Sequence, residues 1–207
     1  GLILTEQGEL LFRTAHDVFS KLAMVEARIA DNKDEAQGPL KVTTTVAFGS
    51  IWLTPRMREF KTLYPDIAIS LVLADTELDL SMRQADVAIR LAPPKQPDLI
   101  QRYIMTMNYH VYASEEYLAE HGTPARPQDL DDHLNWLLTA GAPPGATREP
   151  VLRVNSIYGI YRAVQSGLGI GALPDYMSRE ADNLKEVLPE LRGPSIEAYF
   201  VYPEELR

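Results

Sequence analysis

Two short stretches of the chain are predicted to lie at a turn and at a helix start, and both positions favour the binding of an anion. Phe48, Gly49 and Ser50 form the first stretch, and Asn155 with Ser156 forms the second. Turns and helix starts leave backbone N–H groups without partners, and these groups attract negative charge. A small carboxylate is therefore the leading class of ligand. Ordinary turns and helix caps use the same residue types, so each stretch also fits a purely structural role.

The residue types that perform catalysis form no recognisable group. The chain has no cysteine, which removes thiolate metal sites and cysteine nucleophiles. His16, His110, His121 and His133 show neither metal-ligand spacing nor a nucleophile partner. We therefore expect no enzyme activity, no metal and no cofactor.

Two further patterns imitate binding motifs. Gly167, Gly169 and Gly171 imitate the glycine series of a dinucleotide loop, but they follow a predicted helix and lead into a strand, which is the reverse order. Helix termination and close packing explain them better. The acidic run at 129–132 lacks the glycine and distal glutamate of a calcium loop, so a solvated helix start is the better interpretation.

Alternating strand and helix patterns position the first stretch. The β-branched residues between Leu40 and Val46 predict a strand, and Thr54 with Pro55 predicts a helix start. This order indicates a parallel sheet with right-handed crossovers. The next predicted elements are a strand over Ile67–Leu73, a short helix over Glu77–Gln84 and a strand over Val87–Leu91.

A second lobe is predicted after a long extended passage from Leu99 to Tyr112. Ser114 predicts the cap of a helix that ends at Gly122. The last strand then returns to the first lobe. The remaining predicted elements are strands at Trp136–Thr139, Val151–Val154, Gly169–Leu173 and Ile196–Tyr202, and a helix from Asn155 to Ser166.

An amphipathic pattern precedes both lobes. From Leu4 to Ile29, apolar residues are spaced by seven, four, three, four, three and four positions, which is the seam of a helix that packs lengthwise on another helix. Gly38 and Pro39 cannot continue such a helix. A helix that lies on its own domain is the alternative. The proposed dimerisation residues are Leu11, Ala15, Val18, Leu22, Val25 and Ile29.

Charge and hydropathy exclude several classes of protein. The 207 residues include 20 basic and 29 acidic side chains, and this net charge of −9 opposes binding to a phosphate backbone by the chain itself. No segment is long and apolar enough to cross a bilayer, and the N-terminal residues do not resemble a secretion signal. A cytoplasmic protein without a membrane partner is expected.

Six motifs occur in an order that resembles the LysR-type bacterial transcriptional regulators. The resemblance covers essentially the whole chain in the family's order, and the order and spacing of the motifs are more specific than any one of them. The motifs are Leu4–Gly8, Gly38–Val42, Phe48-Gly49 with Leu53 and Pro55, Asp86–Arg90, Val111–Ser114 with Tyr117-Leu118, and Gly167–Pro174.

The resemblance implies an α/β effector domain with two lobes, similar to type 2 periplasmic binding proteins, after a long dimerisation helix. It also implies a winged helix-turn-helix domain before this helix, through which a homodimer or homotetramer binds DNA. The expected division is 1–37 for the wing end and linker helix, 38–104 plus 197–207 for lobe I, and 105–196 for lobe II.

Physical reasoning and the resemblance place the effector between the lobes, because open parallel sheets bind ligands beyond the carboxyl ends of their strands. Such regulators often have serine or threonine where Ala47 stands. Arg90 is also a candidate partner for an interlobe carboxylate such as Asp75. The predicted effector-binding residues are Thr45, Val46, Ala47, Phe48, Gly49, Ser50, Thr76, Arg90, Asn155, Ser156, Ile170 and Ala172.

Two other functions fit parts of the pattern. A solute-binding protein of a transport system would have a similar two-lobed body, although the amphipathic helix argues against it. An oligomerisation module with a cleft that no longer binds a ligand is the other possibility.

Overall fold

The computed structural model describes residues 36–80, 84–93, 98–130, 133–134 and 150–206, together with Thr5 and Gly8. The predicted dimerisation residues from Leu11 to Ile29 and the predicted strand Trp136–Thr139 lie outside the described residues. At the start of the chain, the Gly8 N–H donates to the Thr5 hydroxyl over 3.1 Å, which is the contact expected of a helix cap.

Lobe I is built on three parallel strands, as the sequence predicts. β1 (Gly38–Thr44) lies between β2 (Ile67–Leu73) and β3 (Val87–Arg90). β1 pairs with β2 along its whole length, from Gly38 opposite Ile67 to Thr44 opposite Leu73. β-Branched and alternating apolar residues account for these strands, because they pack well on a pleated surface.

The chain after β1 differs from the prediction. Phe48, Gly49 and Ser50 do not form a turn, because η1 (Phe48–Leu53) is a π-helical segment that runs directly into α2 (Thr54–Leu63). The Thr54 N–H and hydroxyl both donate to the Gly49 carbonyl, so Thr54 continues the helix instead of capping it. A Cβ at position 49 would lie 2.2 Å from Leu73 Cδ2, so a larger residue there would force the Leu73 side chain to move.

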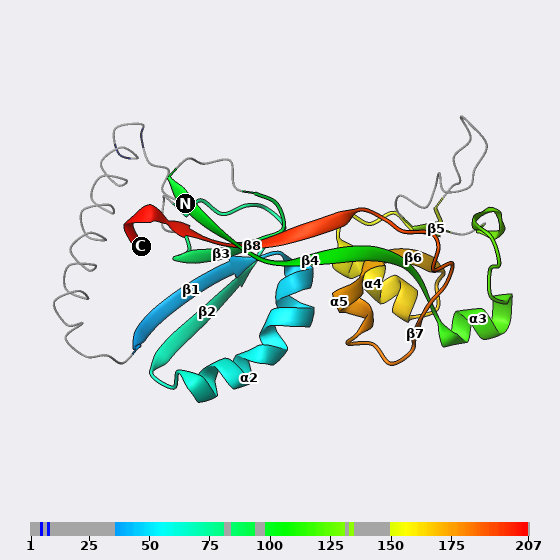
Figure 1. The fold of residues 1–207 in the computed structure, drawn as a ribbon, viewed down its shortest axis with the longest axis horizontal. Coiled ribbons are helices and arrows are strands. Elements are labelled where there is room, and N and C mark those ends of the chain that lie inside the picture. The colour runs from blue at the N-terminus through cyan, green and yellow to red at the C-terminus, as the bar shows by residue number, and fades with distance from the viewer. Residues whose placement is uncertain are drawn as a thin grey trace.

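One long strand connects the two lobes. β4 (Leu99–Ser114) pairs antiparallel with β8 (Ser195–Pro203) from Leu99 to Asn108, and with β6 (Ile170–Pro174) from Tyr109 to Tyr112. The register of β4 and β8 shifts between Tyr103 and Met105. Figure 1 shows β4 and β8 side by side between the group of β1, β2, β3 and α2 and the group of β6, β7 and α3 to α5. The strand order is β2-β1-β3-β8-β4-β6-β5, and β7 also pairs with β4.

Lobe II keeps the predicted helices but not every predicted strand. Ser114 caps α3 through its hydroxyl, which accepts the Tyr117 N–H over 3.1 Å, and Gly167 follows α4 with a φ of +79°. The predicted strand over Val151–Val154 is wrong, because these residues are irregular. Besides β6 and the end of β4, lobe II contains α3 (Glu115–His121), η2 (Pro127–Asp129), β5 (His133–Leu134), α4 (Ile157–Gln165), α5 (Asp175–Ser178) and β7 (Leu184–Glu186). The short helix η4 (Glu204–Leu206) follows β8.

The predicted helix over Glu77–Gln84 is also wrong for the residues that can be described there. Residues 77–80 and 84 are irregular, and 81–83 lie outside the described residues. This segment instead leads from the end of β2 across the ends of the neighbouring strands. Its path brings Glu77 and Leu78 beside Arg90, at the end of β3.

The largest buried cluster extends across both lobes. Phe48 and Leu53 from the first lobe belong to it together with Val164, Leu173 and Met177 from the second. In the parts of the chain that are described, no helix combines the length and apolar character needed to cross a membrane.

Candidate functional site

A cavity of about 210 Å³ opens at the edge of the sheet where β1, β2 and β3 end. Residues 43–45, 74–78 and 88–92 line it, so each of the three strands contributes the segment at its carboxyl end. Alanine, leucine and isoleucine side chains form apolar walls, and threonine, acidic and arginine side chains form the polar part. This combination suits a small molecule with a few polar groups.

Three consecutive threonines in the lining differ in their hydrogen bonds. The Thr43 hydroxyl donates to the Val72 carbonyl over 2.9 Å. The Thr44 and Thr45 hydroxyl oxygens are buried, and they have no hydrogen-bond partner among the described residues. A buried polar group without a partner costs about 1 to 3 kcal/mol. Both oxygens lie beneath the cavity surface, so a ligand can hydrogen-bond to them only after a small shift of the lining.

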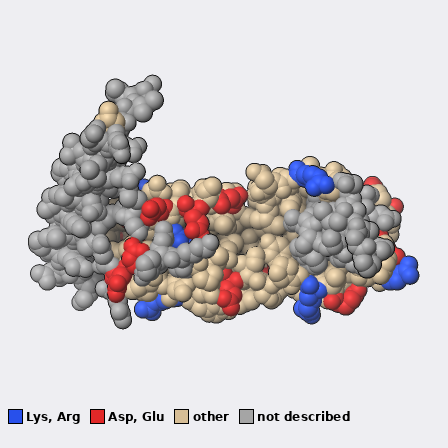
Figure 2. Space-filling model, turned by 90° about the horizontal axis from the view of Figure 1, so that it is seen from above, with Lys and Arg blue, Asp and Glu red and all other residues tan. Residues whose placement is uncertain are grey.

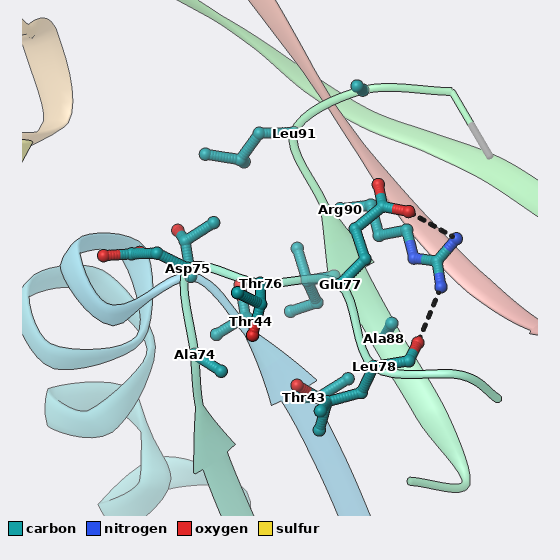
Figure 3. A pocket seen from close by; sticks show the side chains of 13 residues that line it. Thr43, Thr44, Ala74, Asp75, Thr76, Glu77, Leu78, Ala88, Arg90 and Leu91 are labelled. Carbon is teal, nitrogen blue, oxygen red and sulfur yellow. Dashed lines mark hydrogen bonds and ion pairs between the residues drawn. The ribbon is translucent and has the colours of Figure 1, made fainter. Parts of the chain in front are cut away.

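Arg90 is the cation of the lining, and its side chain is only 7% exposed. One guanidinium nitrogen donates to the Leu78 carbonyl over 3.0 Å. Another lies 3.7 Å from a carboxylate oxygen of Glu77, whose side chain is 66% exposed. Figure 3 shows Arg90 turned toward both residues. Arg90 thus pairs with Glu77, and not with Asp75 as the sequence also suggested.

Asp75 connects the two lobes at the place where the sequence predicts an anionic ligand. Its Oδ1 atom accepts the Val46 N–H over 3.1 Å, at the start of the helical segment that leads into η1. Its Oδ2 atom accepts the Ser156 hydroxyl over 3.5 Å, at the N-cap of α4. A carboxylate is stabilised at a helix N-terminus by the aligned peptide dipoles. The chain therefore supplies its own anion at this position.

Aromatic side chains from the two lobes pack against each other near Asp75. Phe48 is fully buried, stacks on Trp52 with ring centres 4.9 Å apart, and meets the edge of Tyr176 at 5.4 Å. Burial raises the pKa of Tyr176 well above its ordinary value, and negative charge on Tyr109, Asp75 and Asp175 adds to this increase. Tyr176 therefore stays protonated at neutral pH.

The cavity contains only part of the predicted effector site. Thr45, Thr76 and Arg90 line it, and Ser156 reaches it through Asp75. Contrary to the sequence prediction, the Gly49 N–H of the first stretch is not free, because it donates to the Thr45 carbonyl. The N–H of Val46, just before the stretch, donates to Asp75. The predicted residues outside the lining are Val46, Ala47, Phe48, Gly49, Ser50, Asn155, Ser156, Ile170 and Ala172.

Burial explains several of these positions. Ala47 and Phe48 are 1% and 0% exposed and belong to the cluster between the lobes. Ile170 and Ala172 are 4% and 0% exposed and pack in a second cluster with Val111. Side chains so deep in a core are unable to contact a ligand in this arrangement of the lobes.

Thr44, Asp75, Glu77 and Tyr176 are missing from the predicted set of effector residues. Thr44 and Asp75 directly precede the predicted Thr45 and Thr76, so a wider window at each strand end would have included them. Tyr176 has no comparable signal, because its position depends on how α5 packs against Phe48. No group of histidine and acidic residues within the described ranges is arranged to hold a metal ion.

Residues 33–207 match the family model described as the LysR substrate binding domain. The chain is 30% identical over 206 residues to the probable HTH-type transcriptional regulator LtrA of Klebsiella pneumoniae, covering 91% of this chain and 66% of that protein. It is 26% identical over 217 residues to an uncharacterised HTH-type transcriptional regulator of Haemophilus influenzae, covering 96% and 74%. The chain thus spans about two thirds to three quarters of these relatives.

The fold is also similar to a solved structure of CrgA, a LysR-type transcriptional regulator from Neisseria meningitidis. The TM-score is 0.70 at 25% identity, and the match covers 97% of this chain and 74% of that one. These relatives are transcriptional regulators and not enzymes, and the match supports the predicted α/β body with two lobes.

The Thr43 hydroxyl has a hydrogen-bond partner and the Thr44 hydroxyl has none, so replacing each by valine should change stability in opposite directions. Thr43→Val is expected to lower the free energy of unfolding by about 1 to 2 kcal/mol, because it removes a buried hydrogen bond. Thr44→Val removes a hydroxyl without a partner, so stability should stay the same or rise by about 1 kcal/mol. Urea unfolding measures both values. A larger loss for Thr44→Val than for Thr43→Val would contradict this assignment.

The raised pKa of Tyr176 predicts a loss of stability at alkaline pH. A folded-state pKa above the unfolded value stabilises the fold below about pH 10, and this contribution is lost as pH rises further. Tyr176→Phe should therefore lose less stability than the wild type between about pH 8 and about pH 11. Tyr64→Phe, at the exposed end of α2, is the control. Identical profiles for wild type and Tyr176→Phe in urea unfolding would exclude this contribution.

Proposed function

Because the chain belongs to the LysR substrate-binding domain family, we propose that it is the effector-sensing and oligomerisation portion of a bacterial DNA-binding transcription regulator. DNA binding would belong to an N-terminal winged helix-turn-helix domain of the intact protein. The net charge of −9 supports this division, because the chain itself has no excess of positive charge for a phosphate backbone. The seam residues from Leu11 to Ile29 would join two copies, and dimers or tetramers would carry the DNA-binding domains.

A small molecule would bind in the cavity at the ends of β1, β2 and β3. The observation that carries this proposal is the pair of buried hydroxyl groups on Thr44 and Thr45 that have no partner among the described residues. A ligand that hydrogen-bonds to them would remove the cost of leaving them unpaired. The position agrees with the rule that open parallel sheets bind ligands beyond the carboxyl ends of their strands.

The ligand would carry a carboxylate. The sequence predicts the carboxylate at Phe48–Ser50 and at Asn155-Ser156, but Asp75 contacts the neighbouring Val46 N–H and the Ser156 hydroxyl, so Arg90 is the more suitable partner. The contact between Arg90 and Glu77 is long, at 3.7 Å, and Glu77 is largely exposed. A ligand carboxylate at hydrogen-bonding distance would replace Glu77 with a shorter, charge-assisted contact.

Ligand binding would change the arrangement of the lobes. We take 38–104 with 197–207 as lobe I and 105–196 as lobe II, and β4 and β8 connect them. Asp75 lines the cavity and contacts Ser156 of lobe II, so a change at the cavity can reach the second lobe through it. A ligand must bind two arrangements unequally to shift their ratio, and about 1.4 kcal/mol of difference shifts it tenfold. A different arrangement of the two lobes would then change the geometry of the oligomer.

A solute-binding protein of transport remains a less favoured alternative. Such a protein would share the two-lobed body and the cavity. The family match and the regulators among the relatives favour the sensor of a transcription regulator instead.

A metabolite screen by calorimetry on the 207-residue chain tests the proposed cavity. Thr44→Val and Thr45→Val should each weaken the binding of a discovered ligand by about 1 kcal/mol or more, which is about fivefold, since each variant removes one hydrogen bond. Thr62→Val is the matched control, because its hydroxyl lies on the exposed face of α2. Wild-type affinity in both cavity variants would place the ligand elsewhere.

A further inference from the structure

We infer that the ligand of this cavity carries a protonated amine beside its acidic group, and that the amine binds at Asp75. This inference rests on the proposed function, because it concerns the same cavity and adds a second group to the same molecule. The proposed ligand class is therefore a small zwitterion, such as an amino acid.

Asp75 has only neutral hydrogen-bond partners among the described residues. The Val46 N–H and the Ser156 hydroxyl contact its two oxygens, over 3.1 and 3.5 Å. Among the described residues, no lysine, arginine or histidine forms an ion pair with it. An ionised carboxylate can accept about four hydrogen bonds, so Asp75 can accept more than these two. The helix starts at Val46 and Ser156 stabilise its negative charge in part, but no basic side chain of the described structure pairs with it.

The cavity lining as a whole has more acidic than basic side chains. Asp75 and Glu77 are its carboxylates, and Arg90 is its cation and already pairs with Glu77. A ligand with only a carboxylate would displace Glu77 and still leave Asp75 without a counter-charge. Figure 2 shows acidic side chains on both halves of the molecule, several of them over lobe I with basic side chains among them. In the lining itself two carboxylates face one cation, and an ammonium group on the ligand would balance the remaining negative charge.

Thr44 and Thr45 add two oxygen acceptors to the lining that contains Asp75. Their hydroxyl oxygens are buried and have no partner among the described residues, and Thr44 is only 4% exposed, so a shift of the lining would have to expose them. An ammonium group has three N–H donors, so it could then donate to Asp75 and to these hydroxyl oxygens. Figure 3 shows Asp75 and Thr44 on one side of the lining and the Arg90 contacts on the other. The two charged ends of a zwitterion would therefore have separate places.

Capping explains only part of the position of Asp75. Acceptance of the Val46 N–H is an ordinary helix-cap contact and needs one oxygen. Asparagine would supply the same acceptor, because its side-chain carbonyl oxygen has two lone pairs. The negative charge is what distinguishes Asp75 from a simple cap, and the test removes this charge alone.

The experiment titrates the 207-residue chain with five related four-carbon probes and follows backbone amide NMR shifts. The probes are 2-, 3- and 4-aminobutyrate, which differ in the distance between amine and carboxylate, with butyrate and n-butylamine as controls that lack one charge. At least one aminobutyrate should bind about tenfold or more tightly than both controls, because each lost charge removes a charge-assisted hydrogen bond. The amides of residues 44–46 and 75–77 should shift.

Three variants separate the charge of Asp75 from its structural role. Asp75→Asn keeps an oxygen for the Val46 N–H and should abolish the preference for aminobutyrate over butyrate, while its thermal unfolding shows whether the fold is kept. Ser156→Ala removes the interlobe contact but keeps the charge, so the preference should remain. Glu77→Gln, at the other carboxylate of the lining, should also keep the preference.

The outcomes distinguish this inference from the proposed carboxylate site. Butyrate binding as tightly as every aminobutyrate, or an unchanged preference in Asp75→Asn, would overturn the amine inference and leave the carboxylate proposal standing. Butylamine binding as tightly as the best aminobutyrate would support the amine and contradict the carboxylate. Absence of any shift at the cavity with all five probes would overturn both.

Discussion

The antiparallel pairing of β4 with β8 is the constraint on which the rest of the structure depends. β4 is a single strand of 16 residues, and it belongs to the sheet of lobe I through β8 and to the sheet of lobe II through β6 and β7. The sheets of both lobes are therefore joined to the same strand, β4. The register shift between Tyr103 and Met105 lies within this connection. Such irregularities bend and twist a strand locally, so the connection can change direction without losing the pairing on either side.

The position of the cavity follows from the way in which the strands end. β1, β2 and β3 are parallel, so their carboxyl ends meet at one edge, and the backbone groups beyond them lose the regular ladder. Side chains there must satisfy the helix start at Val46 and the buried guanidinium of Arg90. Asp75 and Glu77 do so from the segment after β2, which leaves the Thr44 and Thr45 hydroxyls unpaired in the described structure. A site for a ligand is thus formed by the polar groups that the fold itself does not use.

The sequence predicts what depends on local patterns and misses what depends on tertiary contacts. The strands from Ile67 to Leu73 and from Val87 to Arg90, and the cap at Ser114, are confirmed because hydrophobic alternation and capping chemistry are local. The π-helical segment at Phe48 is missed, because Gly49 with Ser50 is typical of a turn, whereas here both residues continue a helical segment that packs beside Leu73. Val151–Val154 has apolar residues but no strand partner. Likewise, the predicted anion position assumes free N–H groups, but Asp75, from the segment after β2, accepts the Val46 N–H there.

The central claim is that occupancy of the cavity changes the relation between the lobes. Since the chain has no cysteine, Thr62→Cys on α2 and Glu120→Cys on α3 provide two unique and exposed positions for nitroxide labels. Pulsed electron paramagnetic resonance then measures the distance between the lobes with and without a saturating aminobutyrate probe. A displacement of the mean distance by about 2 Å or more is expected if binding rearranges the lobes. An identical distance distribution at a concentration where NMR shows the cavity to be saturated would contradict the claim.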